Sequence, residues 1–335
     1  MTSNKILFFC PKDTMNEATE YYVDILKEAL AKSGYEVFQS DNFRDTKFFK
    51  NIFVMSAKWC FLVKLVNPKT NIITWFQGLG GEEALLTRNS KRDKAIWSVL
   101  EKFAMKFSSL NIYVSNKMRS YYLERYRITD NNYFIMPCFN KELNKSSFCY
   151  PKKYDTPSFV YAGGLDKWQC IEQTLELYKE IEKKVPQASI TLLTKEKQKA
   201  SELIEKYNIK NSTIKFVSLD MLNKELERYK YGFLIRDDHI VNNVSTPTKM
   251  NSYLANGIIP IYTNVIRDFN YNFNKKSFIL LDNKANISDW CEHILSIESN
   301  DIVDVEDYQS EVSELFSSYY SRNFYIDKIV NSLVL

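Results

Sequence analysis

Histidine is nearly absent from this sequence. Only His239 and His293 occur among 335 residues, and they lie far apart along the chain. A phosphotransfer mechanism that needs two histidines together is therefore not expected. Proton transfer in any reaction would have to use mainly other side chains.

Cysteine pairs with the spacing of metal or redox sites are also missing. The six cysteines include no C-x-x-C pair, and only Cys291 has a histidine close by, His293. This pattern is typical of reduced, mostly buried thiols in a cytosolic protein, and it disfavours a disulfide framework or a zinc site. The other five are Cys10, Cys60, Cys138, Cys149 and Cys170.

Long apolar runs are absent as well. The run from Ile6 to Cys10 stops at Pro11, which is too short for a signal peptide, and no stretch is long enough to span a bilayer. We therefore expect a cytoplasmic protein. The net charge of +4 is too small to indicate a nucleic-acid partner. It is compatible with an anionic nucleotide or with peripheral association at an anionic membrane surface.

What the sequence does contain is a repeated alternation of strand and helix patterns. The length of 335 residues indicates about two domains, and 45% apolar with 26% charged residues is typical of a globular chain. The alternation runs from residue 5 to 137, pauses over a linker at 138–156 and restarts at residue 158. It predicts an α/β fold with two parallel, doubly wound sheets.

The predicted domains follow from this pause. We expect a Rossmann-like N-terminal domain over 1–150 and a Rossmann-like C-terminal domain over 151–310. A C-terminal helix over 311–335 would follow, and its aromatic residues make it a candidate to pack on the first domain.

One stretch, Arg236 to Ile261, combines a strand end, a polar loop and a helix start. We expect Thr246 to cap the helix and Pro247 to lie in its first turn, since proline lacks the N–H group that would be unused there. Thr248 and Lys249 would then lie where free N–H groups and the helix dipole favour an anion. With Arg236 at the strand end, a diphosphate becomes a candidate ligand. An ordinary capped helix with a solvated lysine is the alternative.

Two features of the first half allow two interpretations each. The loop Q-G-L-G-G-E-E (Gln77 to Glu83) lacks the G-x-G-x-x-G spacing and the lysine of a phosphate loop. Its glycines would let a ligand approach the backbone, or Glu82 and Glu83 would complement the dipole of the next helix. The amphipathic helix expected over Lys91 to Phe107 is either a core helix with a solvated basic face or a membrane-surface helix.

Several motifs together resemble a known family, the GT-B glycosyltransferases, and within them the retaining family 4 enzymes of bacterial capsule and O-antigen synthesis. The most specific is P-T-K-M-N-S-Y-L-A-N-G-I-I-P, from Pro247 to Pro260. The others are Y-A-G-G-L-D-K-W (Tyr161 to Trp168), I-R-D-D (Ile235 to Asp238), W-F-Q-G-L-G-G-E-E (Trp75 to Glu83) and Y-V-S-N-K-M (Tyr113 to Met118). The resemblance implies two Rossmann-like domains that face a central cleft.

The resemblance also implies roles for residues. The second domain would hold a nucleotide-sugar donor, with Arg236 and Lys249 on the diphosphate, and the first domain would hold the acceptor. The remaining donor residues would be Gly163 and Gly164 for backbone approach, Lys167 as a third cation, Thr246, Pro247 and Thr248 at the helix start, Val217 and Ser218 near the nucleobase, and Ser252 where relatives usually have a ribose-binding glutamate. On the acceptor side the candidates are Gln77, Gly78, Glu82 and Glu83.

The expected activity is transfer of a sugar from a nucleoside-diphosphate sugar to a glycan, a lipid-linked or a protein-linked acceptor. Arg236 and Lys249 would stabilise the departing diphosphate. No D-x-D motif lies in a suitable loop; the nearest acidic pair is Asp237 and Asp238, for which pairing with Arg236 is the alternative to a metal-binding role. The reaction is therefore predicted to need neither a metal nor another cofactor, while retention of configuration follows from the resemblance alone.

Two other functions stay open. Ser252 in place of glutamate, and Gly164 in place of the usual arginine, are compatible with a catalytically silent partner that binds a nucleotide sugar. A GT-B-shaped sugar-nucleotide epimerase is the other alternative, and the lack of histidine in the first half counts against it.

Overall fold

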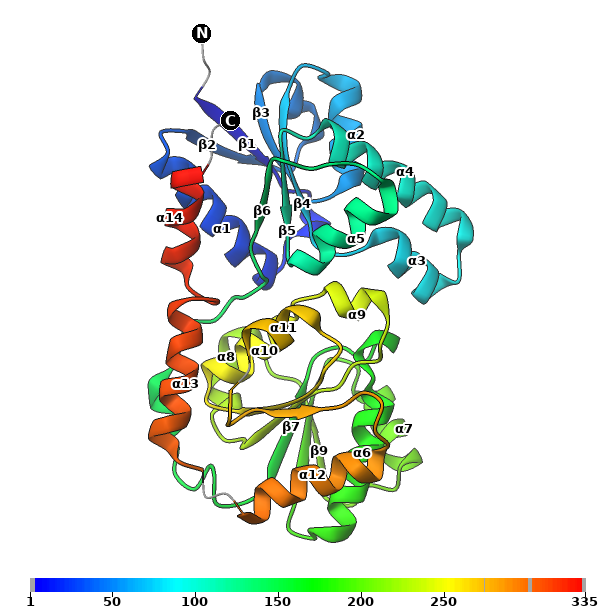
Figure 1. Cartoon of the computed structure of the whole chain (residues 1–335), viewed down its shortest axis with the longest axis vertical. Helices are drawn as coiled ribbons and strands as arrows, with labels where there is room; N and C mark the ends of the chain where they lie inside the picture. The colour runs from blue at the N-terminus through cyan, green and yellow to red at the C-terminus, as the bar shows by residue number, and fades with distance from the viewer. Residues whose placement is uncertain (1–3, 274, 301–302, 333–335) are drawn as a thin grey trace. The chain divides into compact units, whose positions relative to one another are not determined.

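The computed structural model describes residues 4–273, 275–300 and 303–332. They form two compact units, each with its own core (Figure 1). Unit 1 comprises residues 1–140, 244–246 and 321–335, and unit 2 comprises residues 141–243 and 247–320. The chain therefore leaves unit 1 ten residues before the expected boundary at 150 and returns to it twice.

Unit 1 contains a parallel sheet. Among the described residues it has six strands in the order β2-β1-β3-β4-β5-β6. Its central strands are continuous apolar runs such as Ile6 to Phe9, as expected for strands that helices cover on both faces. The strands are β1 (Lys5–Phe9), β2 (Glu36–Ser40), β3 (Asn51–Val54), β4 (Asn71–Phe76), β5 (Leu110–Tyr113) and β6 (Tyr133–Ile135). The helices are α1 (Glu17–Lys32), α2 (Ala57–Val66), α3 (Gly80–Arg88), α4 (Lys91–Phe107), α5 (Asn116–Tyr126) and α14 (Arg322–Ser332), with the 3-10 helices η1 (Lys12–Thr14) and η2 (Phe43–Phe48).

Unit 2 contains a second parallel sheet. Its described strands number six, in the order β12-β11-β10-β7-β8-β9. The strands are β7 (Ser158–Ala162), β8 (Ser189–Leu193), β9 (Ser212–Lys215), β10 (Tyr231–Leu234), β11 (Ile259–Thr263) and β12 (Ile279–Leu281). The helices are α6 (Ile171–Lys184), α7 (Lys197–Lys206), α8 (Leu219–Leu226), α9 (Ile240–Val244), α10 (Thr248–Ala255), α11 (Arg267–Asn272), α12 (Ile287–Asn300) and α13 (Val305–Ser317), with the 3-10 helices η3 (Lys145–Cys149) and η4 (Lys167–Gln169).

The strand order of unit 2 defines where a ligand would bind. From β7 the chain first adds β8 and β9 on one side, and then β10, β11 and β12 on the other. The connections after β7 and β10 therefore diverge, and open α/β sheets bind ligands at such a switch point, outside the carboxyl ends of the strands.

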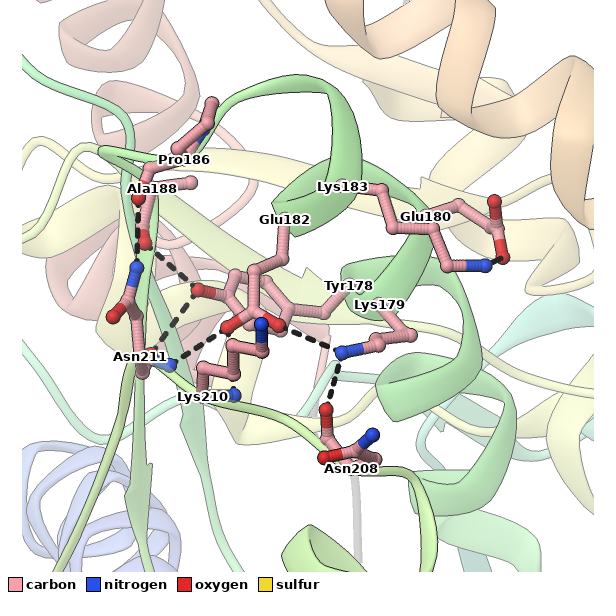
Figure 2. A network of polar contacts seen from close by, with 10 residues as sticks. All are labelled: Tyr178, Lys179, Glu180, Glu182, Lys183, Pro186, Ala188, Asn208, Lys210 and Asn211. Atoms are coloured by element: carbon pink, nitrogen blue, oxygen red, sulfur yellow. Dashed lines mark hydrogen bonds and ion pairs between the residues drawn. The ribbon is translucent and has the colours of Figure 1, made fainter.

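A polar network holds α6 against neighbouring segments of unit 2 (Figure 2). The buried carboxylate of Glu182 accepts hydrogen bonds from the backbone N–H groups of Lys210 (2.9 Å) and Asn211 (2.7 Å) and pairs with Lys179 (3.0 Å). Burial opposes its ionisation, but these donors hold the pKa of Glu182 below its ordinary value. Tyr178 donates from its hydroxyl to the carbonyls of Ala188 and Asn211. The network joins α6 to the turns that precede β8 and β9.

The C-terminal tail is two helices, where the sequence predicted one. α13 belongs to unit 2, whereas α14 belongs to unit 1 and lies beside α1 (Figure 1). Arg322 pairs with Glu28 of α1 at 2.8 Å, and the ring of Tyr325 contacts those of Phe134 and Phe139. Residues 333–335 of the expected helix lie outside the described residues.

Two local predictions were wrong. The segment Gln77 to Glu83 was expected to be a loop, but α3 begins at Gly80. Its start is stabilised because the Glu83 carboxylate accepts a hydrogen bond from the Leu79 N–H (3.1 Å) at the N-cap position, which offsets the low helix propensity of the glycines. The polar loop after β10 likewise contains α9.

None of the helices in the described ranges is long and apolar enough to cross a membrane.

Candidate anion-binding site

Arg236 is the second residue after β10 and is held from several directions. It is buried, with 3% of its surface exposed. Its backbone N–H donates to Thr263 Oγ1 of β11 (2.9 Å), and that hydroxyl donates back to the Arg236 carbonyl (2.8 Å). Its Nη1 donates to the carbonyls of Ile235 (2.8 Å) and Gln169 (3.1 Å), and its Nη2 donates to Gln169 Oε1 (2.7 Å). The guanidinium is therefore fixed at the carboxyl edge of the sheet.

The guanidinium of Arg236 donates its hydrogen bonds to neutral oxygens. No ion pair of the described residues involves it, so the alternative interpretation of Asp237 and Asp238 as its pairing partners does not hold. The reason is that each carboxylate has another partner: Gln173 Nε2 donates to Asp237 (2.7 Å), and Asn243 Nδ2 donates to Asp238 (2.9 Å). Burial lowers the pKa of Arg236 because nothing anionic offsets the lost hydration.

Lys249, in the first turn of α10, lies beside Arg236. Its Nζ donates to the same Gln169 Oε1 (3.2 Å) and lies 3.7 Å from the centre of the Tyr161 ring, within cation–π range. Burial, and then the positive charge of Arg236, lower the pKa of Lys249 well below its ordinary value. The two cations thus share one neutral oxygen. An anion bound between them would raise the pKa of both Arg236 and Lys249 again.

The loop after β7 completes this arrangement. Gly163 has φ +140°, and a Cβ atom there would lie 3.3 Å from Lys249 Cε, so the loop backbone passes directly over the lysine. Tyr161 donates from its hydroxyl to the Gly164 carbonyl (2.5 Å). The Leu165 N–H donates to Glu196 (2.6 Å), and Lys199 Nζ donates to the Leu165 carbonyl (2.8 Å). These contacts pin the first half of the loop.

The start of α10 differs from the prediction by one residue. Pro247 occupies the N-cap position, and Thr248 is the first helical residue. Thr246 does not cap the helix, because within unit 1 its buried hydroxyl accepts a hydrogen bond from the Cys138 N–H (3.0 Å). The N-cap residue Pro247 makes no side-chain cap, and the Met250 N–H donates to the Pro247 carbonyl (3.1 Å), so the N–H groups of Thr248 and Lys249 are the candidates to meet an anion.

The other predicted donor residues lie elsewhere in unit 2. Ser252 is buried within α10, and Lys167 is exposed in η4. Val217 packs against the core after β9, and Ser218 precedes the first residue of α8. No hydrogen bond of the described residues joins any of these four to Arg236 or Lys249. The structure therefore brings together Arg236, Lys249 and the Gly163 backbone.

The predicted acceptor residues lie in one segment of unit 1, but most of them already contact other residues of that unit. Glu82 pairs with Lys94 (2.7 Å) and Arg125 (3.3 Å), and a Cβ atom at Gly78 would lie 2.1 Å from Glu83 Oε1. Both glutamates lie in the first turn of α3, as the dipole interpretation requires. Gln77 is exposed and donates to the Met55 carbonyl (3.1 Å).

Gln169 is the site residue that sequence reasoning missed. A single glutamine in W-Q-C has no pattern that marks it, and only the fold brings its side chain between two cations from other elements. No three metal-binding side chains group together within the described part of the chain.

Comparison with known proteins identifies the fold. No protein-family model and no curated protein sequence matches this chain. Among solved structures, Anabaena HepE in complex with UDP-glucose has a TM-score of 0.70 at 11% identity, over 98% of each chain. Sucrose-phosphate synthase from Thermosynechococcus elongatus has a TM-score of 0.70 at 12% identity, over 98% of this chain and 97% of that one.

A third similar structure is a mutant of S. aureus TarM in complex with fondaparinux, alpha-GlcNAc-glycerol and UDP. Its TM-score is 0.65 at 14% identity, over 84% of this chain, and the chain spans only 54% of the length of TarM. These likenesses show that the chain has the GT-B fold of glycosyltransferases, with two parallel six-stranded sheets and flanking helices in its described residues.

Proposed function

We propose that this protein is a glycosyltransferase that moves a sugar from a nucleoside-diphosphate sugar to an acceptor, with retention of configuration. The observation that carries the proposal is the pair of Arg236 and Lys249 at the switch point of unit 2, with only neutral acceptors on their nitrogens. Keeping two cations together in this way is costly unless an anion joins them. The GT-B fold and the UDP and UDP-glucose complexes of HepE and TarM support a nucleotide sugar as that anion.

The chemistry assigned to the site is electrostatic. As the glycosidic bond breaks, negative charge grows on the leaving diphosphate, and Arg236, Lys249 and the first N–H groups of α10 stabilise it. This role needs no metal and no further cofactor, and the carboxylates of Asp237 and Asp238 are already engaged by amide donors. The resemblance of the sequence motifs to the family 4 enzymes supports a bacterial surface polysaccharide, such as a capsule or O-antigen, as the pathway. The acceptor would be a glycan, a lipid-linked or a protein-linked sugar.

We also propose that α4 rests on an anionic membrane surface. Ile96 is 50% exposed, Val99 66% and Phe107 45%, and their spacing places them on one face of the helix. Lys91, Arg92, Lys102 and Lys106 on the same helix are exposed. Its two acids are engaged elsewhere, since Asp93 pairs with Arg88 (3.2 Å) and Glu101 is buried. An apolar face with only basic exposed charges is complementary to anionic lipid headgroups.

Product analysis tests the enzymatic proposal. The protein is incubated with UDP-, GDP-, CDP- and ADP-sugars, with and without nitrophenyl glycosides and polyprenyl phosphates as acceptors. We expect free nucleoside diphosphate to appear with one donor class, and only when an acceptor is present. Binding without turnover across the panel would instead favour the silent partner, and a change of sugar configuration without nucleotide release would favour the epimerase.

A further inference from the structure

Gln169 occupies a singular position between the two cations. Its Oε1 lies 2.7 Å from Arg236 Nη2 and 3.2 Å from Lys249 Nζ. Arginine and lysine are donors only, so the carboxamide must present its oxygen to both. In the part of the chain that the structure describes, this oxygen is the one side-chain hydrogen-bond acceptor that either cation has.

An anion between the two cations would need the position that this oxygen fills. A phosphate oxygen makes charge-assisted hydrogen bonds, which are stronger than those of a neutral amide, so a diphosphate would displace the carboxamide. We propose that Gln169 is a placeholder: it occupies the diphosphate subsite in the free protein and leaves it when the nucleotide binds. This inference rests on the proposed function, because it assumes that Arg236 and Lys249 bind a diphosphate.

The surrounding backbone allows this exchange. The Leu165 contacts with Glu196 and Lys199 hold the first half of the loop, whereas Gln169 lies beyond them in η4. That turn is closed by a local hydrogen bond from the Gln169 N–H to the Asp166 carbonyl (2.8 Å), and Asp166 and Lys167 are exposed. A rotation of the Gln169 side chain therefore breaks its side-chain contacts with the cations. The Leu165 contacts that hold the loop stay in place.

The placeholder has a thermodynamic signature. A contact present only in the free state stabilises that state and weakens binding by the same factor. Gln169→Ala should therefore lower the stability of the free protein and tighten diphosphate binding, roughly three- to tenfold for one hydrogen-bonding group. At saturating ligand the variant and the wild type should be equally stable, because the Gln169 side chain then contacts neither cation, and the backbone carbonyl that accepts from Arg236 Nη1 is present in both proteins.

The experiment combines calorimetric titration with inorganic pyrophosphate and UDP, and urea unfolding with and without these ligands. Gln173→Ala is the matched control, because Gln173 is a nearby glutamine that contacts Asp237 and neither cation. It should leave pyrophosphate affinity unchanged. Gln169→Glu should place a carboxylate between Arg236 and Lys249, stabilise the free protein and reduce pyrophosphate affinity at least tenfold.

The outcomes separate the two proposals. If wild type binds pyrophosphate and Gln169→Ala binds it more weakly, Gln169 is a ligand of the anion and the placeholder is wrong. Equal affinity of wild type, Gln169→Ala and Gln169→Glu would also overturn it. If neither wild type nor Gln169→Ala binds pyrophosphate or UDP, the diphosphate site itself is wrong and the placeholder falls with it.

Discussion

At the scale of single residues, the site consists of groups whose burial or backbone conformation lowers the stability of the fold. A guanidinium with 3% exposure and a lysine of lowered pKa occupy adjacent positions, and a glycine with a left-handed backbone passes above them. Each of these features carries a cost in stability, and such costs cluster at functional sites. Their convergence on one point distinguishes this helix start from an ordinary cap.

Gly163 provides a direct test of the close approach. Gly163→Ala adds a Cβ atom 3.3 Å from Lys249 Cε at φ +140°, where the backbone is strained for any side chain. We expect pyrophosphate affinity to fall by about tenfold, from strain of about 1–3 kcal/mol and displacement of the lysine. Gly34→Ala is the control, since Gly34 also has a positive φ (+87°) but nothing within 4 Å of the added atom. Equal affinity in both variants would argue against a tight fit at Lys249.

Lys153 gives the protein a pH-dependent contribution to stability. It is buried and donates from Nζ to the carbonyls of Ser147 and Asn256, and burial lowers its pKa from 10.5 to about 7. Between these two values the unfolded chain holds a proton that the folded chain has lost, so the free energy of unfolding rises with pH. We expect wild type to gain stability relative to Lys153→Met between pH 7 and pH 9 in urea unfolding. A free energy of unfolding of wild type that falls relative to that of Lys153→Met as the pH rises would contradict the lowered pKa.

At the scale of elements, the alternation of strand and helix patterns predicted two parallel sheets, and the helix expected over Lys91 to Phe107 is α4. It also predicted that Arg236 and Lys249 would meet at one strand end. It missed α3 because helix propensity disfavours two glycines, and the stabilising contact of Glu83 with Leu79 is visible only in three dimensions. It misplaced the N-cap of α10 because the Thr246 hydroxyl accepts a hydrogen bond from the Cys138 N–H, more than a hundred residues away in the sequence.

The exposed face of α4 predicts a membrane interaction that a single charge should weaken. Val99→Glu places a carboxylate in the centre of the apolar stripe, which opposes both apolar burial and attraction to anionic lipid. We expect a several-fold loss of binding to phosphatidylglycerol vesicles in sedimentation assays, and little binding of wild type to phosphatidylcholine vesicles. Tyr271→Glu, at an exposed position of unit 2, is the control for the added charge. Equal sedimentation of all three proteins with phosphatidylglycerol would refute the proposal.

At the scale of the whole molecule, the chain builds two doubly wound sheets and crosses between its units more than once. The sequence predicted two α/β domains, but strand order depends on long-range pairing and was not predictable from local patterns. It is the order of unit 2 that places the loops of Gly163 and Arg236 on either side of a switch point. Residue chemistry suggested an anion, and topology supplies the reason why it would bind at this position.

The central claim is that Lys249 and Arg236 bind a diphosphate, and calorimetric titration of Lys249→Met tests it most directly. Methionine keeps much of the packing and removes the charge, while Lys197→Met makes the same change at an exposed lysine of unit 2. The account predicts that wild type and Lys197→Met bind pyrophosphate and at least one of UDP, GDP, CDP and ADP, and that Lys249→Met binds them at least about tenfold more weakly. Equal affinity of Lys249→Met and wild type would contradict it.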